Sequence, residues 1–200
     1  MLKPHRHDIV LASKFGIEFD LTSPKLPYPL VANADPKKIK SALEGSLQRL
    51  HTDYLDLYYK HRPDPRVEPE AVAEVMAELI KEGKIRAWGV SEAPAEYIRR
   101  AHAVCPISAV QNRYSMLARQ HEALFPLLAE LNIGLVAFSP LANGILSGSY
   151  DQNSHFDPKY DYRANMPQFQ QESYAQNQAL FELLSKIAQE HEATMAQLSL

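Results

Sequence analysis

Apolar residues follow two alternating patterns along this chain. In one pattern they recur at every third or fourth position, as on one face of a helix. In the other they form short continuous runs, and the two patterns take turns along the chain. Strands alternating with helices predict parallel pairing through right-handed crossovers, hence a β/α barrel or a doubly wound sheet. Five segments are nearly continuous apolar runs, which is typical of strands buried on both faces: Ile9 to Gly16, Tyr54 to His61, Ile85 to Ser91, Ala109 to Ser115 and Gly134 to Ser139.

Start and stop signals bound the predicted helices. Asp35 can cap a helix that has Pro36 at its first position and an apolar stripe that includes Ile39 and Leu43. Gly83 fits the left-handed position that ends a helix. We expect further helices over Pro69 to Glu82, Pro94 to Ala103, His121 to Asn132 and Ser173 to Glu192, and Thr194 as the cap of one that begins at Met195.

Two segments lack both patterns. Glu18 to Asn33 is rich in proline, and Ser147 to Gln171 is rich in Asp, Asn, Gln, Tyr and Pro. Loops longer than about 12 to 15 residues in compact domains tend to be functional or disordered. We therefore expect each segment to be either a substrate lid or a disordered loop.

Composition narrows the class of protein. With 46% hydrophobic and 22% charged residues, the chain is typical of a soluble globular protein, and we expect residues 1–200 to form a single domain. No apolar run approaches the ~20 residues needed to cross a membrane, so no membrane association is expected. The net charge is −3 and the basic residues are scattered, so the sequence predicts no basic surface that would bind nucleic acid.

The single cysteine, Cys105, excludes an internal disulfide and a cysteine-based zinc site. The start of the chain, Met1 to His5, lacks the apolar stretch of a secretory signal, so we expect a cytoplasmic protein. His5 and His7 offer two imidazoles, but they precede the first strand and so lie opposite the expected site. We predict no metal centre.

Two basic residues stand at the C-terminal ends of predicted strands. Lys14 precedes the glycine that turns the chain, and His61 ends the second strand. In a barrel such ends line the active-site mouth, and adjacent strands lie about 4.8 Å apart, so both side chains can reach one ligand. Lys60 is then expected to point the other way, outward. The alternatives are a rim lysine paired with a carboxylate and a histidine with a purely structural role.

The next three strands also end in polar or aromatic residues. Hydroxyl, amide and aromatic groups that converge would suit a planar heteroaromatic ligand, although any one of them could simply satisfy backbone groups. These residues are Ser91, Glu92, Gln111, Asn112, Phe138 and Ser139.

Five ordered segments resemble the aldo-keto reductases. In that family such segments belong to a (β/α)8 barrel that reduces aldehydes and ketones with NADPH, without metal. The resemblance therefore implies an α/β fold of the (β/α)8 TIM-barrel type. The segments are Ser13 to Gly16, Leu50 to Arg62, Gly83 to Ser91, Val110 to Ser115 and Ala137 to Leu141.

The resemblance assigns roles to these residues. Lys14 and His61 match the last two members of the family's Asp, Tyr, Lys and His tetrad. Lys14 would lower the pKa of the tyrosine that donates the proton, and His61 would hydrogen-bond the carbonyl oxygen.

The resemblance also implies a cofactor site. Three residues depart from the common pattern, because Glu92 stands where many members carry asparagine, His51 where many carry glycine, and Phe138 where many carry tyrosine. By resemblance, Ser91, Glu92 and Gln111 would hold the nicotinamide carboxamide, Phe138 would stack on its ring, and Ser139, Leu141, Asn143 and Gly144 would lie near the pyrophosphate.

The match begins after the family's aspartate and tyrosine and covers about five of eight strands, from the middle of the barrel. We expect a fragment truncated at both ends, inactive alone, whose barrel is completed by missing segments or by oligomerisation. The small carbonyl substrate and the choice between NADP and NAD stay open. Alternatives are a non-catalytic NADP(H)-binding or regulatory protein, and a lyase that forms a Schiff base at Lys14.

Overall fold

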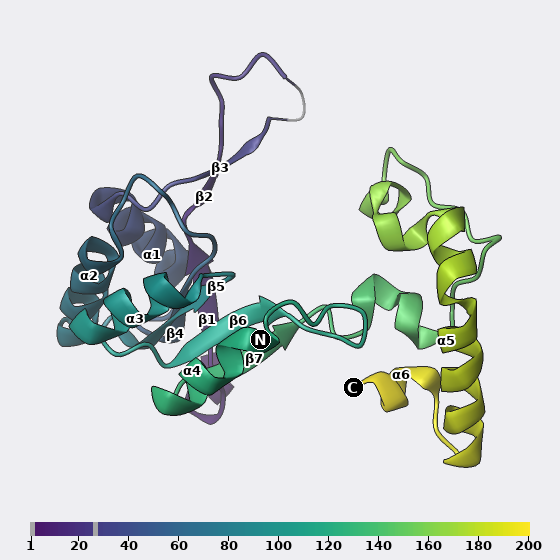
Figure 1. Ribbon diagram of the computed structural model, residues 1–200. Helices are drawn as coiled ribbons and strands as arrows, with labels where there is room; N and C mark the ends of the chain where they lie inside the picture. The colour runs from purple at the N-terminus through teal and green to yellow at the C-terminus, as the bar shows by residue number, and fades with distance from the viewer. Residues whose placement is uncertain (1–2, 26–27) are drawn as a thin grey trace. The chain divides into compact units, whose positions relative to one another are not determined.

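The structure, a computed structural model, describes residues 3–25 and 28–200 (Figure 1). Met1 and Leu2 lie outside the described residues; they begin the segment from which we predict that no secretory signal is present. Leu26 and Pro27 of the first predicted loop also lie outside them. The chain forms two compact units, Met1–Asn112 with Ala123–Val136, and Arg113–Glu122 with Ala137–Leu200. A single domain over residues 1–200 stays a prediction.

A five-stranded sheet forms the centre of the first unit, in the order β1-β4-β5-β6-β7. The pairs β1–β4, β4–β5 and β5–β6 are parallel, which confirms the predicted α/β class with parallel strands. All five predicted strands are present: β1 Ala12–Phe15, β4 Leu55–Lys60, β5 Ile85–Ser91, β6 Ala109–Arg113 and β7 Gly134–Phe138.

The first strand begins three residues later than predicted. The Asp56 carboxylate accepts a hydrogen bond from the Leu11 N–H at 2.9 Å and another from Arg6 at 2.7 Å. The Leu11 carbonyl still accepts from the Asp56 N–H at 3.0 Å, so backbone pairing reaches Leu11, and the Asp56 side chain takes up the Leu11 N–H. Upstream lies η1, a 3₁₀-helix over Lys3–Asp8.

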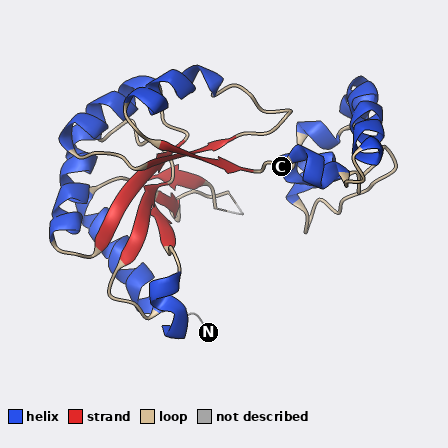
Figure 2. Cartoon of the chain, turned by 90° about the horizontal axis from the view of Figure 1, so that it is seen from below, coloured by secondary structure: helices blue, strands red, loops and turns tan. Residues whose placement is uncertain are grey.

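Helices α1 Pro36–Leu50, α2 Pro69–Lys81 and α3 Ala95–Val104 follow β1, β4 and β5 along the chain and run along the outer side of the sheet (Figure 2). The Asp35 carboxylate accepts from the Lys37 N–H at 2.9 Å, which confirms the predicted cap. Gly83, after α2, has φ +73°, as predicted for a helix-ending glycine.

The helix predicted over His121 to Asn132 is wrong in its length. A 3₁₀-helix, η2 Glu122–Leu124, is followed by α4 Phe125–Glu130. Pro126 lies in the first turn of α4 and has no N–H, so it cannot bond back to the carbonyl of Glu122 and one continuous α-helix cannot form.

The core of this unit lies between the sheet and its helices. Trp88 of β5 is fully buried, and its Nε1 donates to the Cys105 carbonyl at 3.3 Å. Ile39 and Leu43 of α1 and Met76 of α2 are also fully buried. The apolar stripe predicted for α1 therefore faces the core.

The prediction of an irregular loop over Glu18 to Asn33 is wrong for part of the segment. β2 Ile17–Phe19 and β3 Leu30–Ala32 pair in an antiparallel hairpin that extends away from the sheet (Figure 1). The Glu18 carboxylate accepts from Asn33 at 2.8 Å and lies 3.1 Å from the Lys38 ammonium. These bonds hold the base of the hairpin.

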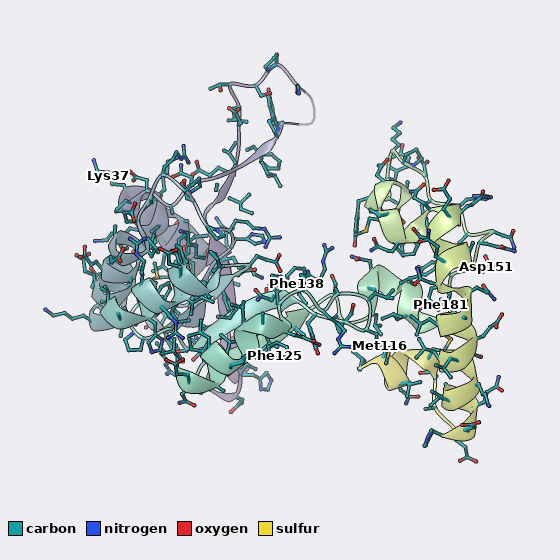
Figure 3. All side chains as sticks on the ribbon, in the orientation of Figure 1. Lys37, Met116, Phe125, Phe138, Asp151 and Phe181 are labelled. Carbon is teal, nitrogen blue, oxygen red and sulfur yellow. The ribbon has the colours of Figure 1, made fainter. Side chains whose placement is uncertain are left out.

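The second unit has its own small core around Leu146, Phe169, Tyr174 and Leu184, with Phe181 of α5 packed against it (Figure 3). Thr194 forms the predicted cap, a reciprocal capping box with Gln197. The predicted loop over Ser147 to Gln171 contains two 3₁₀ turns. The elements are η3 Ala142–Ser147, η4 Tyr162–Asn165, η5 Pro167–Phe169, α5 Gln171–Glu190 and α6 Met195–Ser199. Among the described residues, no helix has the length and apolar character to span a membrane.

Candidate functional site at the strand ends

Lys14 and His61 lie on the same face of adjacent strands. Lys14 is paired with Tyr59 in the β1–β4 register. Because side chains alternate along a strand, His61 shares the face of Tyr59 and Lys14. The His61 N–H donates to the Phe15 carbonyl at 2.9 Å, which ties the residue after β4 to the end of β1.

His61, Ser91 and Gln111 form one row across three strands. Lys60 pairs with Val90 in the β4–β5 register, so His61 stands beside Ser91, and Ser91 pairs with Gln111 in the β5–β6 register. Lys14 lies one layer toward the strand starts, at the level of Tyr59. The register thus brings together four of the predicted site residues.

Tyr59 and Gly89 form the floor beneath this row. A Cβ on Gly89 would lie 2.5 Å from Cε1 of Tyr59 and 2.6 Å from the Ala109 carbonyl. The absence of a side chain at Gly89 therefore leaves room for the Tyr59 ring. The Lys14 ammonium lies 5.9 Å from the centre of that ring.

Lys60 points to the opposite face, as predicted, but the prediction that it points outward is wrong, because it is buried in the core between the sheet and α3. Its side chain is 1% exposed, and its Nζ donates to the Tyr97 hydroxyl of α3 at 2.9 Å. Burial lowers the Lys60 pKa to about 8, against a weaker opposing effect of Asp64. Lys60 belongs to the interior of the fold, and the row on the other face does not include it.

The electrostatics favour a neutral imidazole at His61. Burial, followed by the positive charges of Arg62 and Lys14, lowers the His61 pKa below its usual 6.5. Lys14 is exposed, and in residues 3–25 and 28–200 no carboxylate lies within 4.0 Å of its ammonium. The alternative of a rim lysine paired with a carboxylate therefore does not apply within the described chain.

Ser91 and Gln111 offer a hydroxyl and an amide to one ligand. Ser91 is buried, and the Gln111 amide makes no hydrogen bond to any residue that the structure describes. Glu92 has φ +55°, a left-handed conformation that asparagine adopts more readily than glutamate. Its N–H donates to Asn112 Oδ1 at 2.9 Å. Asn112 is fully buried and holds this turn.

The remaining predicted residues belong to the second unit. Phe138 ends β7 (Figure 3), with the Arg113 guanidinium 5.8 Å from its ring centre. Ser139 has φ +52° at the turn after β7, and Leu141 immediately precedes η3. The roles of these residues toward a cofactor stay predictions.

Asn143 and Gly144 shape the loop of the second unit. The Asn143 amide donates to Tyr162 at 3.1 Å and accepts from Gln168 at 3.1 Å, so its side chain already bridges the loop. Gly144 has φ +106°, and a Cβ there would lie 2.7 Å from Cε2 of Tyr150. Only glycine fits at this position.

Sequence reasoning did not single out Arg62, which lies beside the row. Its Nη1 lies 3.5 Å from the His61 carbonyl oxygen and 3.5 Å from Ser91 Oγ. A second basic residue directly after the strand-end histidine was the available signal. The strand register places His61 beside Ser91, and so brings Arg62 close to Ser91 as well.

A separate depression of about 950 Å³ lies around the N-terminal end of β4, where η1 meets the end of α1. His51, at its edge, follows the last residue of α1 and has φ +52°. Glycine adopts this left-handed conformation most readily, which fits the glycine that many aldo-keto reductases carry at this position. None of the predicted site residues lines this depression.

Comparison with known proteins places these features in a family. The model of the aldo/keto reductase family matches residues 1–200. Aldo-keto reductase str7 of Strobilurus tenacellus is 39% identical over 199 residues, which are 98% of this chain and 56% of that protein.

Two solved structures are similar in fold. Glycerol dehydrogenase AKR11B4 from Gluconobacter oxydans matches with a TM-score of 0.83 and 26% identity, over 92% of this chain and 56% of that one. An aldo/keto reductase from Klebsiella pneumoniae, solved with NADP and acetate, matches with a TM-score of 0.65 and 26% identity, over 99% and 56%. The chain spans about half the length of these relatives, and its five-stranded sheet with flanking helices matches part of their barrels.

Proposed function

We propose, from the premise that this chain belongs to the aldo/keto reductase family, that it binds NADP(H) and contributes half of a site that reduces aldehydes or ketones to alcohols. The observation that carries the proposal is the row of His61, Ser91 and Gln111 on the face that also bears Lys14. Family membership supports the reaction, and the relative solved with NADP supports the cofactor.

Ser91 and Gln111 suit the carboxamide of a nicotinamide ring. Oγ of Ser91 and the Gln111 amide supply donors and acceptors at one level of the sheet, and the Gln111 amide has no competing partner among the described residues. The bound cofactor supplies the hydride. Phe138, Ser139, Leu141, Asn143 and Gly144 are proposed to hold its ring and pyrophosphate on the basis of the resemblance.

His61 is proposed to donate a hydrogen bond to the substrate carbonyl oxygen. A neutral imidazole has one N–H, which fixes the carbonyl and stabilises the negative charge that develops on oxygen. The Lys14 ammonium adds positive charge on the same face. In the family it also lowers the pKa of the proton-donating tyrosine.

A second candidate is a non-catalytic NADP(H)-binding protein. Tyr59, which pairs with Lys14 on this face, has a pKa that burial raises, so it is poorly suited to replace the family's proton donor. We therefore expect cofactor binding without turnover from this chain alone. Turnover is expected only when a strand bearing the family's aspartate and tyrosine is present.

We also propose a cytoplasmic location. Cys105, the only cysteine, is a free and buried thiol, which fits a reducing compartment.

Fluorescence titration of the purified chain with NADPH tests the proposal. The chain is expected to bind NADPH saturably. Oxidation of NADPH by an aromatic aldehyde is expected only in a version extended upstream to include the strand that bears the Asp and Tyr. In that version, Lys14→Met and His61→Asn should each reduce kcat by about 100-fold or more.

Two results would separate the candidates. Binding with no turnover in the extended version would favour the non-catalytic protein. No NADPH binding by either version would overturn both.

A further inference from the structure

Arg62 follows His61 directly and lies at the level of the row. Its Nη1 is 3.5 Å from Ser91 Oγ on β5 and 3.5 Å from the His61 carbonyl oxygen. The guanidinium therefore lies between the ends of β4 and β5, beside two residues assigned to the reaction.

The hydrogen-bonding capacity of Arg62 is largely unused. A guanidinium has five N–H donors in a planar fork, and the two contacts, both from Nη1, lie at the outer limit of hydrogen-bond length. Within residues 3–25 and 28–200, no carboxylate lies within 4.0 Å of it. Arg6 and Arg66 of the same unit each have an aspartate partner, at 2.7 and 2.9 Å.

The surroundings of Arg62 favour an anion. His61 precedes Arg62 in the chain, and the positive charges of Arg62 and Lys14 both act on His61. The nearby Asp64 carboxylate is already bonded to Arg66 and to the Ala34 N–H at 3.0 Å. A half-buried guanidinium without a carboxylate is costly to hold, and its planar fork matches a carboxylate or phosphate.

We propose that Arg62 determines substrate specificity by binding an anionic group of the carbonyl substrate, so that carboxylate-bearing aldehydes are preferred over neutral ones. This inference rests on the proposed carbonyl-reducing function and names its substrate class. Since the loop around Ser139 to Gly144 is proposed to hold the cofactor phosphates, we assign the anion at Arg62 to the substrate.

The experiment compares two aldehydes of similar shape, para-formylbenzoate and its neutral methyl ester. Their dissociation constants are measured by calorimetry on the purified chain, with and without NADP. Variants are Arg62→Met, which removes the charge, and Arg62→Lys, which keeps the charge but not the fork. Arg99→Met is the matched control, because Arg99 pairs with Glu130 on the surface of α3.

The wild-type chain should bind formylbenzoate about 10- to 100-fold more tightly than the ester, the range expected of a charge-assisted contact. Arg62→Met should abolish this preference, Arg62→Lys should retain part of it, and Arg99→Met should leave it unchanged. Equal binding of both aldehydes by the wild type, or a preference that survives Arg62→Met, would overturn the inference.

NADPH affinity separates the two sources of an anion. It should be the same in wild type and Arg62→Met. If Arg62→Met weakens NADPH binding 10-fold or more, the anion belongs to the cofactor and the inference fails. If no form binds NADPH while the Arg62-dependent preference persists, the anion site stands and the proposed reductase function fails instead.

Discussion

The N–H of His61 donates a 2.9 Å hydrogen bond to the carbonyl of Phe15. This bond holds the residue after β4 against the end of β1, so the imidazole shares a face with the Lys14 ammonium. A shift of one residue in the register would place His61 on the helix side, where Lys60 now lies. The candidate site therefore depends on strand pairing more than on any loop.

The charge on His61 should respond to its two basic neighbours. Burial, Arg62 and Lys14 lower its pKa below 6.5, so removal of either positive charge should raise that pKa. NMR titration of the imidazole in wild type, Lys14→Met and Arg62→Met measures the effect, with the His61 signal assigned from its loss in His61→Asn.

Lys37→Met is the matched control for that titration. Lys37 is exposed in the first turn of α1 (Figure 3), and its charge is not among those that act on the His61 pKa. Its replacement should leave the His61 pKa unchanged. An unchanged His61 pKa in both Lys14→Met and Arg62→Met would mean that the three groups do not lie together.

Replacing the buried Lys60 with methionine should stabilise the chain. A lysine whose pKa is lowered from 10.5 to about 8 carries a penalty of about 3 kcal/mol at pH 7, part of which is offset by its bond to Tyr97. We expect Lys60→Met to raise the free energy of unfolding by about 1 to 2 kcal/mol in urea. The exposed Lys81→Met should change it by less than about 0.5 kcal/mol.

The gain from Lys60→Met should depend on pH. Below about pH 8 the lysine is protonated in both the folded and unfolded states, so the penalty is fully present. Between about pH 8 and 10.5 the folded state loses the proton first, so wild-type stability rises with pH. The difference between wild type and variant should narrow over this range. A constant difference would show that the Lys60 pKa is not lowered.

Adding a methyl group at Gly89 should disturb the floor of the site. The new Cβ would lie 2.5 Å from the Tyr59 ring and 2.6 Å from the Ala109 backbone. We expect Gly89→Ala to lower the free energy of unfolding by about 1 to 3 kcal/mol. Fluorescence of the only tryptophan, the buried Trp88, measures unfolding.

Gly134→Ala serves as the control for that change, because a Cβ there would come no closer than 3.6 Å, to the Ser108 carbonyl. It should alter stability by no more than about 0.5 kcal/mol. Equal effects of the two substitutions would contradict the close packing of Tyr59 on Gly89.

Removing the Ser91 hydroxyl should weaken cofactor binding. Loss of one neutral hydrogen bond costs about 1 kcal/mol, so the Kd for NADPH should rise about 5-fold in Ser91→Ala. Ser108→Ala, before β6 and outside the row, should leave the Kd unchanged. A Kd that is equally unaffected by both would exclude Ser91 from the cofactor site.

The sheet could be predicted largely because its strands are apolar on both faces. The β5 prediction, Ile85 to Ser91, has the same bounds as the strand observed. Polar residues that end such runs were therefore visible as candidates, and periodicity placed Lys60 on the opposite face. That its ammonium is buried against Tyr97 was not predictable, because the contact joins β4 to a helix formed later in the chain.

Other features depend on contacts that periodicity does not encode. The β2–β3 hairpin has three residues in each strand, and its Phe19 and Leu30 are largely exposed, so it has no buried alternation to detect. The segment before β1 is held by the Asp56 side chain, which accepts from Arg6 and from the Leu11 N–H. Arg62 gained its significance only from the register beside Ser91.

NMR of the chain during NADPH titration tests the central claim most directly, namely that the ends of β4, β5 and β6 hold the nicotinamide. The account predicts that saturation shifts the His61 imidazole, the Ser91 amide and the Gln111 side-chain amide together, with one Kd, while the control residue Lys37 is unaffected. Saturable NADPH binding that leaves all three signals in place would contradict it.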